Sequence, residues 1–381
     1  MKILHTGDLH LDSAFCAFGA KDAERQRALG RDLLRRIFDC AREENCELML
    51  ISGDLFDSRY VSEETGELFC SLVENSGIYV ALSPGNHDPY FENSFYSKAQ
   101  ARLGEKFVLF TSPELQIFDV DSLKVRIFGY AFTSMALLRS PLSGADIPPK
   151  GGYIHLLCAH ADIFSPVSRY APVSPEEIKR ADFDYAALGH VHNKWSDFTD
   201  ERVRYCGFGE GRSFDELGEG GVWIVDTDGD SFACERKILS TRVFCTDTVS
   251  VCADDTLASL KEKICDRIRA EHGSEGVYLR LTLEGVADDM LVRDICGAVG
   301  DIEKECSLEF LEITDATMPL LDGDYLERDM TLRGALYRTL RPKLASSDEA
   351  ERRRAVKALR IGLAAIDGRN IFAVGERGGQ R

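Results

Sequence analysis

The chain has 381 residues, of which 44% are hydrophobic and 29% are charged, and this composition excludes a disordered or fibrous protein. No apolar run reaches the roughly 18 residues that a membrane span needs, and the N-terminus lacks the pattern of a signal peptide. The net charge of −18 argues against a protein that only holds nucleic acid, because such proteins are usually basic.

The 12 cysteines are scattered singly and form no C-x-x-C pair. This spacing excludes a zinc finger, and it also excludes the disulfide framework of a small secreted protein. Buried, reduced thiols are the simplest interpretation. We therefore expect a soluble, cytoplasmic protein with no membrane anchor.

Strand-like and helix-like segments alternate in the first half of the chain. Nearly continuous apolar runs predict strands that are covered on both faces. These runs are residues 3–5, 48–52, 78–82, 125–130, 154–159, 185–188 and 222–225. Amphipathic periodicity predicts helices at 22–45 and 62–75, and Ser-Pro-Glu-Glu at 174–177 is a capping box that begins a short helix. The alternation indicates an α/β fold.

The pattern changes near residue 239. Residues 243–315 read as strand, helix, strand, helix and strand, which predicts a second compact α/β unit. Two helices are predicted at 325–344 and 347–366. The predicted parts are a catalytic domain (1–238), a small α/β capping domain (239–321) and a basic helical C-terminus (322–381).

Polar side chains with metal-binding chemistry follow five of the predicted strands. Five of the eight histidines in the chain fall at these positions. The residues are Asp8 and His10, then Asp54, then Asn86, His87 and Asp88, then His160, and finally His190 and His192. Because open α/β sheets bind ligands at the carboxyl ends of their strands, we expect these side chains to converge.

A mixed set of carboxylate, imidazole and amide ligands without thiolate suits Mn²⁺, or else Fe²⁺ or Zn²⁺, better than Ca²⁺ or Mg²⁺. Two such ions roughly 3.5–4 Å apart can clamp a phosphoryl group and activate a water molecule. The pattern therefore predicts hydrolysis of a phosphate ester. The alternative, that these residues only stabilise turns, needs a separate explanation for each motif.

The ordered series D-x-H, G-D-x-x-D, G-N-H-D, a lone His and G-H-x-H resembles the calcineurin-like metallophosphoesterases over residues 1–235. Within them the chain looks most like DNA-repair exonucleases of the SbcD type. Residues 205–207 and 211–221 are similar to the subgroup called YhaO-like. The resemblance implies a four-layer sandwich, in which two packed mixed β-sheets lie between helices, followed by a small α/β cap and C-terminal helices.

The resemblance also implies a role for each site residue. One divalent ion would be held by Asp8, His10 and His192, the other by Asn86, His160 and His190, and Asp54 would bridge them. His87 would be the catalytic histidine that helps to protonate the leaving oxygen, and Asp88 would orient its ring. The usual nucleases have proline-glycine-serine where this chain has residues 206–208, which leaves substrate contacts there open but not the metal site.

Three residues near these motifs have two interpretations each. Arg212 either clamps a substrate phosphate or pairs with Asp215 or Glu216. Asp57 either supports a metal ligand or caps a turn. His5, on a predicted buried strand, is expected to be a core residue and not a ligand.

The C-terminus differs in charge from the rest of the chain, since residues 325–381 hold 13 Lys and Arg against 7 Asp and Glu. In residues 347–366 the apolar side chains have coiled-coil spacing. This helix either packs back on the chain or offers a seam to a partner. By resemblance, the partner would be an SMC-like, SbcC-type ATPase, and a homodimer is left open.

The function predicted from all of this is a metal-dependent DNA exonuclease that acts in DNA repair by a two-metal mechanism, with endonuclease activity left open. Two alternatives remain at this stage. One is a phosphatase or phosphodiesterase for a small molecule or a phosphoprotein. The other is an adaptor subunit of the ATPase complex.

Overall fold

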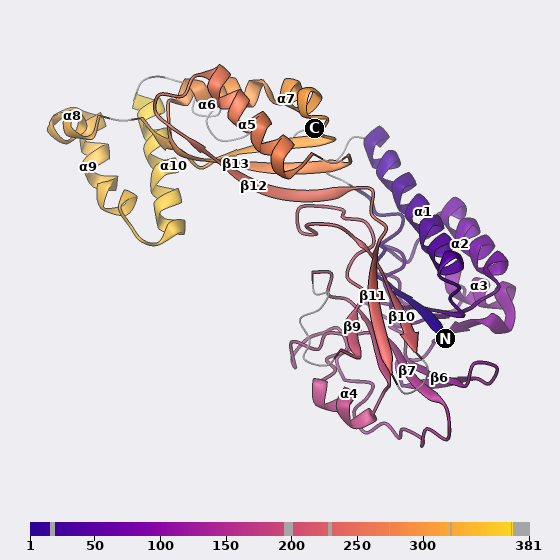
Figure 1. Cartoon of the computed structure of the whole chain (residues 1–381). Coiled ribbons are helices and arrows are strands. Elements are labelled where there is room, and N and C mark those ends of the chain that lie inside the picture. The colour runs from indigo at the N-terminus through magenta and orange to yellow at the C-terminus, as the bar shows by residue number, and fades with distance from the viewer. Residues whose placement is uncertain are drawn as a thin grey trace. The chain divides into compact units, whose positions relative to one another are not determined.

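The computed structural model describes residues 1–15, 20–193, 201–227, 231–273, 275–320, 322–366 and 368. The chain divides into two compact units, Met1–Val243 and Phe244–Arg381. The first unit contains all of the predicted site residues and is built from two sheets (Figure 1).

The first sheet has six strands in the order β11-β10-β1-β2-β3-β4. Its strands are β1 (Lys2–Thr6), β2 (Leu48–Ile51), β3 (Tyr79–Leu82), β4 (Phe107–Leu109), β10 (Gly221–Thr227) and β11 (Phe232–Ile238). Strands β1 to β4 are parallel, whereas β10 and β11 run antiparallel to their neighbours, so the sheet is mixed. The helices α1 (Ala20–Glu43), α2 (Glu63–Ser76) and α3 (Phe95–Leu103) connect the parallel strands.

The second sheet has five strands in the order β5-β6-β7-β8-β9. They are β5 (Gln116–Val120), β6 (Val125–Gly129), β7 (Ile154–His160), β8 (Tyr185–Gly189) and β9 (Val203–Tyr205). Only β5 is antiparallel to its neighbour. The short helix α4 (Pro175–Ala181) begins with the predicted capping box, in which Ser174 and Glu177 each accept a backbone N–H bond from the other residue.

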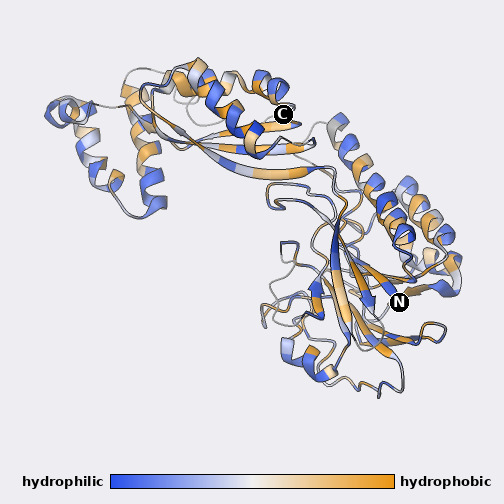
Figure 2. Ribbon diagram, in the orientation of Figure 1, coloured by the Kyte–Doolittle hydropathy of each residue, from blue (hydrophilic) through white to orange (hydrophobic). Residues whose placement is uncertain are grey.

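Alternating side chains of each sheet face two different cores. Leu48 and Leu50 of β2 pack with Leu156 and Cys158 of β7, so the sheets lie face to face. The opposite faces are covered by α1 and α2 on the first sheet and by α4 on the second. Most strands are accordingly hydrophobic along their length, whereas α1 and α2 are mixed (Figure 2). The predicted arrangement of two packed mixed sheets between helices is confirmed.

The second unit has its own core. Its sheet contains β12 (Val243–Val251), β13 (Val277–Ala287), β14 (Phe310–Asp315) and β15 (Met318–Pro319), and its first helices are α5 (Leu257–Glu271), α6 (Asp289–Gly297) and α7 (Val299–Cys306). Leu260, Ile264 and Ile268 of α5 pack on Leu279 and Leu281 of β13. The sequence predicted one helix where α6 and α7 are separate, because the backbone breaks at Ala298.

The chain continues in three helices, α8 (Gly323–Arg328), α9 (Leu332–Leu344) and α10 (Glu349–Ile366), and not in the two predicted. The break follows from local capping: Asp329 accepts hydrogen bonds from Thr331, whose own hydroxyl caps α9. Gly334 also approaches the Asp329 carbonyl so closely that no Cβ would fit.

The apolar seam predicted on α10 is largely used within the chain. Leu359 and Leu363 are buried, and Gly362 lies against Leu336 of α9. Arg360 pairs with Asp315 at the end of β14. Of the two interpretations, packing back on the chain therefore accounts for the centre of this seam.

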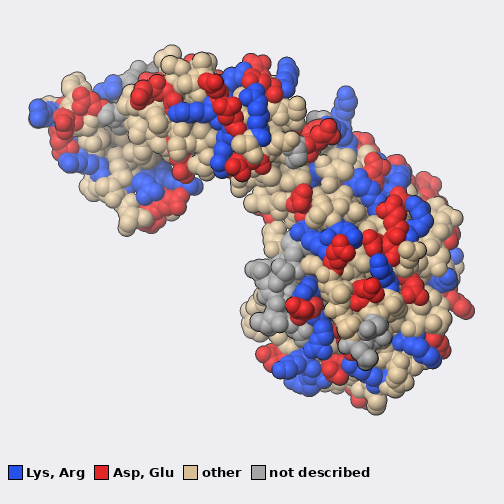
Figure 3. All heavy atoms as spheres, viewed as in Figure 1, with Lys and Arg blue, Asp and Glu red and all other residues tan. Residues whose placement is uncertain are grey.

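Charged side chains are distributed over the surface. On the face shown in Figure 3, basic and acidic side chains are interspersed, so the acidic excess is not gathered in one patch there. Among the described helices, none combines the length and the apolar character that crossing a bilayer requires.

Candidate metal centre

The carboxyl ends of five strands supply the site. Strands β1, β2 and β3 of the first sheet and β7 and β8 of the second end at or just before the predicted ligands. The loops after β1 and β2 are joined by hydrogen bonds from Asp8 N to the Gly53 carbonyl and from His10 N to the Asp54 carbonyl, each 2.9 Å. Across the sheets, His160 Nδ1 lies 3.0 Å from the Ser52 carbonyl and the His190 N–H donates to Asp8 Oδ2 at 2.8 Å, so both sheets present their ligands at one place.

Unusual backbone conformations turn the ligands inward. Asp8, His10 and Asp54 have φ values of 48°, 44° and 47°, and His190 has a φ of 107°. A non-glycine residue in this left-handed region costs on the order of 1 kcal/mol or more, and such residues gather at functional sites. A Cβ at Gly85 would collide with the Asp54 carboxylate, so this position requires glycine.

One group of ligand atoms comes from Asp8, His10 and His192, which can hold a metal ion together. The Nε2 atoms of His10 and His192 are 3.3 Å apart, and His192 Nε2 lies 3.8 Å from Asp8 Oδ1. These are the residues predicted for one ion.

The second group surrounds His160. Its Nε2 lies 3.0 Å from Asn86 Oδ1 and 3.4 Å from Asp54 Oδ2. Asp54 Oδ2 is also 3.6 Å from His10 Nε2, so this carboxylate stands between the two groups. The His190 ring lies 5.2 Å from the His160 ring, centroid to centroid. The structure thus brings all seven predicted ligands together.

These residues fit a pair of divalent cations. Asp8 Oδ1 is buried and accepts no hydrogen bond within the described part of the chain, which leaves its lone pairs for an ion. Burial raises the pKa of Asp8 to about 7 and also raises the pKa of Asp54, because uncompensated buried carboxylates are unfavourable. Positive ions at this position would offset that cost.

The histidine tautomers suit metal binding as well. Each Nδ1 of the three inner histidines faces an acceptor: Asp57 Oδ1 at 2.9 Å for His10, Glu216 Oε1 at 2.7 Å for His192, and the Ser52 carbonyl at 3.0 Å for His160. With the proton on Nδ1, every Nε2 offers its lone pair to the centre. Burial lowers the pKa of His160 to about 3, so this ring is neutral at physiological pH.

His87 reaches the same centre from the outside. Its side chain is 46% exposed, and its ring lies 4.7 Å from that of His10. Its Nδ1 is 3.3 Å from the Asp57 carbonyl and 3.7 Å from Asp57 Oδ1. Asp57, and not the predicted Asp88, therefore lies beside the His87 ring.

Asp88 has another task in this structure. It is buried, and its carboxylate accepts hydrogen bonds from the backbone N–H groups of Phe56 and Gly85, at 3.0 and 2.8 Å, and from the Tyr96 hydroxyl. Among the described residues, no hydrogen bond or ion pair joins Asp88 to the His87 ring. Asp88 positions the loop that carries Asn86 and His87, which is a correction to the orienting role predicted for it.

Arg212 pairs with Glu216, one of the two partners that the sequence left open. Its Nη2 donates to Glu216 Oε1 at 2.5 Å, and its Nη1 lies 3.5 Å from Asp57 Oδ1. Glu216 was not among the site residues predicted from the sequence. Its position four residues after Arg212, inside the YhaO-like stretch, was the only signal for it.

Cys206 also touches the centre, although it lies in the segment expected to affect only substrate contacts. Its buried thiol donates to Asp8 Oδ2 at 3.2 Å, and the His190 backbone N–H donates to the same oxygen at 2.8 Å. The departure from the family pattern at this position therefore bears on a metal ligand.

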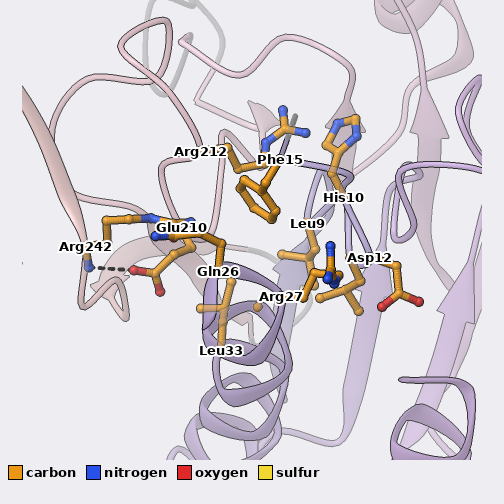
Figure 4. A pocket seen from close by; sticks show the side chains of 12 residues that line it. Leu9, His10, Asp12, Phe15, Gln26, Arg27, Leu33, Glu210, Arg212 and Arg242 are labelled. Atoms are coloured by element: carbon orange, nitrogen blue, oxygen red, sulfur yellow. Dashed lines mark hydrogen bonds between the residues drawn. The ribbon is translucent and has the colours of Figure 1, made fainter. Parts of the chain in front are cut away.

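A shallow, solvent-open pocket lies beside the first ligand group. Figure 4 shows Arg212 and His10 at one end of it, with Arg27 and Arg242 further along its wall. Asp12 and Glu210 also line it, and Arg27 and Arg212 pair with carboxylates, so the charge around this pocket is mixed.

Divalent-metal affinity is expected to rise with pH between about pH 6 and about pH 8. A proton on Asp8, whose pKa burial raises to about 7, competes with the ion. Burial lowers the pKa of His192, but Asp8 and Glu216 outweigh it and raise that pKa, which adds a second competing proton. Affinity should change by up to about tenfold per pH unit for each proton displaced.

Calorimetric titration of Mn²⁺ in two buffers of different ionisation enthalpy would measure both the affinity and the protons released. Constant affinity across this range, without proton release, would contradict the expectation.

Comparison with known protein families identifies the class to which this chain belongs. A family model described as calcineurin-like phosphoesterase matches residues 1–194. The chain therefore belongs to the calcineurin-like phosphoesterases, as its motifs predicted, and its Asp and His groups are those of a metal-dependent phosphoesterase. It is a hydrolase with a two-metal type of site.

The chain is also similar to individual members of this family and to a solved structure. The chain is 25% identical over 362 residues to the uncharacterized metallophosphoesterase YhaO of Bacillus subtilis (strain 168), covering 87% of this chain and 83% of that protein. It is also 25% identical over 271 residues to the SbcD component of the nuclease SbcCD of Staphylococcus epidermidis, covering 62% and 69%. A crystal structure of a dimetal phosphatase from Danio rerio matches with a TM-score of 0.42 and 13% identity, over 63% of this chain and 96% of that one.

Proposed function

We propose that this chain is a metal-dependent DNA phosphodiesterase, most simply an exonuclease that acts in DNA repair. The observation that carries the chemistry is the complete donor set of two metal sites with the exposed His87 beside it. The choice of DNA as substrate is supported by the relative that is described as part of a nuclease. Mn²⁺ is the ion we propose, because the ligands mix nitrogen and oxygen without thiolate.

Bound divalent ions would supply Lewis acidity toward the phosphate and an activated water nucleophile. The protein contributes the arrangement of the ligand side chains. Asp54 stands between the two ligand groups. The Nε2 atoms of His10, His160 and His192 are directed toward these groups and would be unprotonated when they hold the ions. His87, in its protonated form, donates a proton from Nε2 to the departing sugar oxygen while Asp57 holds its Nδ1.

DNA binding by the isolated, metal-free protein is expected to be weak and strongly salt-dependent. With a net charge of −18, the chain repels DNA wherever no ion or local basic group compensates. A fluorescence anisotropy titration of labelled duplex at two salt concentrations measures this. Tight binding that does not change with salt would contradict it.

We also propose that the C-terminal helices bind an SbcC-type ATPase. The relative that is described as one subunit of a larger nuclease supports a complex. Because the centre of the α10 seam is buried, the exposed apolar residues Tyr325, Met330 and Leu332 around the α8–α9 break are the better docking surface. Replacing Met330 and Leu332 together with aspartate should abolish co-purification with such an ATPase from the same organism. Unchanged co-purification would exclude this surface.

The deciding experiment is Mn²⁺-dependent cleavage of end-labelled duplex and single-stranded DNA beside bis-p-nitrophenyl phosphate, with Asp54→Ala as control. Loss of label from DNA, absent in the variant, supports the nuclease. Turnover of the small ester with DNA intact, even after the ATPase is added, favours a small-molecule or phosphoprotein phosphatase. No turnover of either substrate leaves the adaptor function.

A further inference from the structure

The guanidinium group of Arg212 is enclosed by two carboxylates. Its Nε lies 3.1 and 3.2 Å from the two oxygens of Glu216, its Nη2 donates to Glu216 Oε1 at 2.5 Å, and its Nη1 lies 3.5 Å from Asp57 Oδ1. The Arg212 backbone N–H also donates to Glu216 Oε2 at 2.8 Å. All three guanidinium nitrogens are therefore engaged.

Each of these carboxylates holds a different histidine of the same metal group. Glu216, whose side chain is only 4% exposed, accepts from His192 Nδ1 at 2.7 Å, and Asp57 accepts from His10 Nδ1 at 2.9 Å. Arg212 Nη2 also lies 3.3 Å from His192 Nδ1. Because Nδ1 cannot donate to Glu216 and accept from Arg212 at once, the shorter contact places the proton between His192 and Glu216.

Removal of the arginine would release both carboxylates. Glu216 would keep only His192 and a backbone N–H, and a buried carboxylate with so few partners is no longer held in its position, since rotation toward water becomes favourable. That rotation removes the acceptor that orients His192. Asp57, which is partly exposed, would lose its ion pair with Arg212.

From this geometry we infer that Arg212, acting through Glu216 and Asp57, is a positioning residue of the metal group Asp8–His10–His192. It joins the supports of two histidines that are 182 residues apart in sequence. The carboxylates take one N–H group from each guanidinium nitrogen, which leaves two of the five, so the phosphate clamp is the competing role that the experiment must separate. The inference concerns the metal site and holds for any phosphoester substrate.

The charge of Arg212 alone would have the opposite effect on metal affinity. An arginine close to a cation site repels the ion, so a residue that acted only through its charge would weaken metal binding, and its removal would strengthen it. A positioning residue has the reverse effect, because loss of the support of a ligand usually costs about 10–100-fold in metal affinity. Removal of a residue that only clamps the substrate leaves metal affinity unchanged and raises KM. These three roles are separated by two measurements.

The experiment compares Arg212→Gln, Arg212→Lys and Glu216→Gln with the wild type. Calorimetry with Mn²⁺ alone gives metal affinity, and steady-state cleavage of bis-p-nitrophenyl phosphate at saturating Mn²⁺ gives kcat and KM. The matched control is Arg59→Gln, which removes an exposed arginine two residues from Asp57.

We expect Arg212→Gln and Glu216→Gln each to weaken at least one Mn²⁺-binding step by about 10–100-fold. KM should stay within about twofold, and kcat should recover as Mn²⁺ is raised. A variant that combines Arg212→Gln with Glu216→Gln should bind Mn²⁺ about as weakly as Arg212→Gln alone, since Arg212 already acts through Glu216. Arg212→Lys should also bind Mn²⁺ more weakly, because an ammonium cannot span two carboxylates.

Unchanged or tighter Mn²⁺ binding in Arg212→Gln, relative to Arg59→Gln, would overturn the inference. So would an increase in KM that excess Mn²⁺ does not reverse. If Arg212→Gln fails to fold, Arg212→Lys, which keeps the charge, decides the matter with the same readouts.

Discussion

Replacing Asp54 with alanine is expected to abolish hydrolysis of every phosphoester that the wild-type protein cleaves. Its Oδ2 lies 3.6 Å from His10 Nε2 and 3.4 Å from His160 Nε2, so it is the carboxylate shared by both ligand groups. Without it, neither ion is held in its relation to the other. The loss of several kcal/mol of transition-state charge stabilisation corresponds to at least about a thousandfold in kcat.

Two companion variants make the Asp54 result interpretable. Asp54→Asn keeps an acceptor for the His87 backbone N–H, which donates to Oδ1 at 2.9 Å, and should therefore keep the loop folded while still losing activity. Asp119 lies on the edge strand β5 and pairs with Arg126 of β6. Asp119→Asn removes this carboxylate and should leave activity unchanged. Retention of substantial activity in Asp54→Asn at ordinary Mn²⁺ concentrations would show that this carboxylate does not bridge.

Replacing His87 with alanine is expected to lower kcat by about a hundredfold to ten-thousandfold while Mn²⁺ affinity stays unchanged. The reason is its place in the structure: it is exposed and lies outside the two ligand groups that Asp54 joins, yet its ring reaches that of His10. The matched control is His272→Ala, which removes a histidine paired with Asp247 in the second unit and should not affect hydrolysis.

The His87 variant also tests a competing geometry. His87 lies close enough to His10 and Asp54 for these three residues to share an ion. If His87 were a metal ligand, Mn²⁺ affinity would fall together with kcat, and excess Mn²⁺ would restore part of the rate. Leaving groups offer a second check, since an ester with a good leaving group needs no proton and should be affected less. Normal cleavage by the variant would remove His87 from the mechanism.

Much of the first unit could be predicted because its signals are local. Apolar runs marked β1, β2, β3, β7 and β8, since buried parallel strands need hydrophobic side chains on both faces. The short or alternating strands β4, β5, β9 and β11 were missed, because their stability comes from the neighbouring strand and not from their own composition. The break between α8 and α9 was missed for a related reason, as capping by Asp329 and Thr331 competes with a helical pattern that continues past it.

The candidate metal ligands could be predicted from the sequence, whereas the residues that hydrogen-bond to them could not. Asp8, His10 and the others recur at strand ends with fixed spacing, and the geometry of strand-to-loop bends leaves such patterns visible in sequence. Asp88 was misjudged because it follows His87 in the chain, whereas its carboxylate faces Tyr96 and the backbone of Phe56 and Gly85. Neighbours in sequence need not be neighbours in space.

The sequence by itself determined the α/β class and predicted the candidate ligands and the two-metal chemistry, because these depend on residue types and on short-range spacing. Only the tertiary structure decided which carboxylate supports which histidine, that Cys206 touches Asp8, and that Arg212 pairs with Glu216 and Asp57. Those contacts join strand ends from two sheets, and their partners are set by how the sheets pack. A hydrogen bond between residues far apart in sequence produces no periodic pattern in the chain, so it can be seen only in the folded structure.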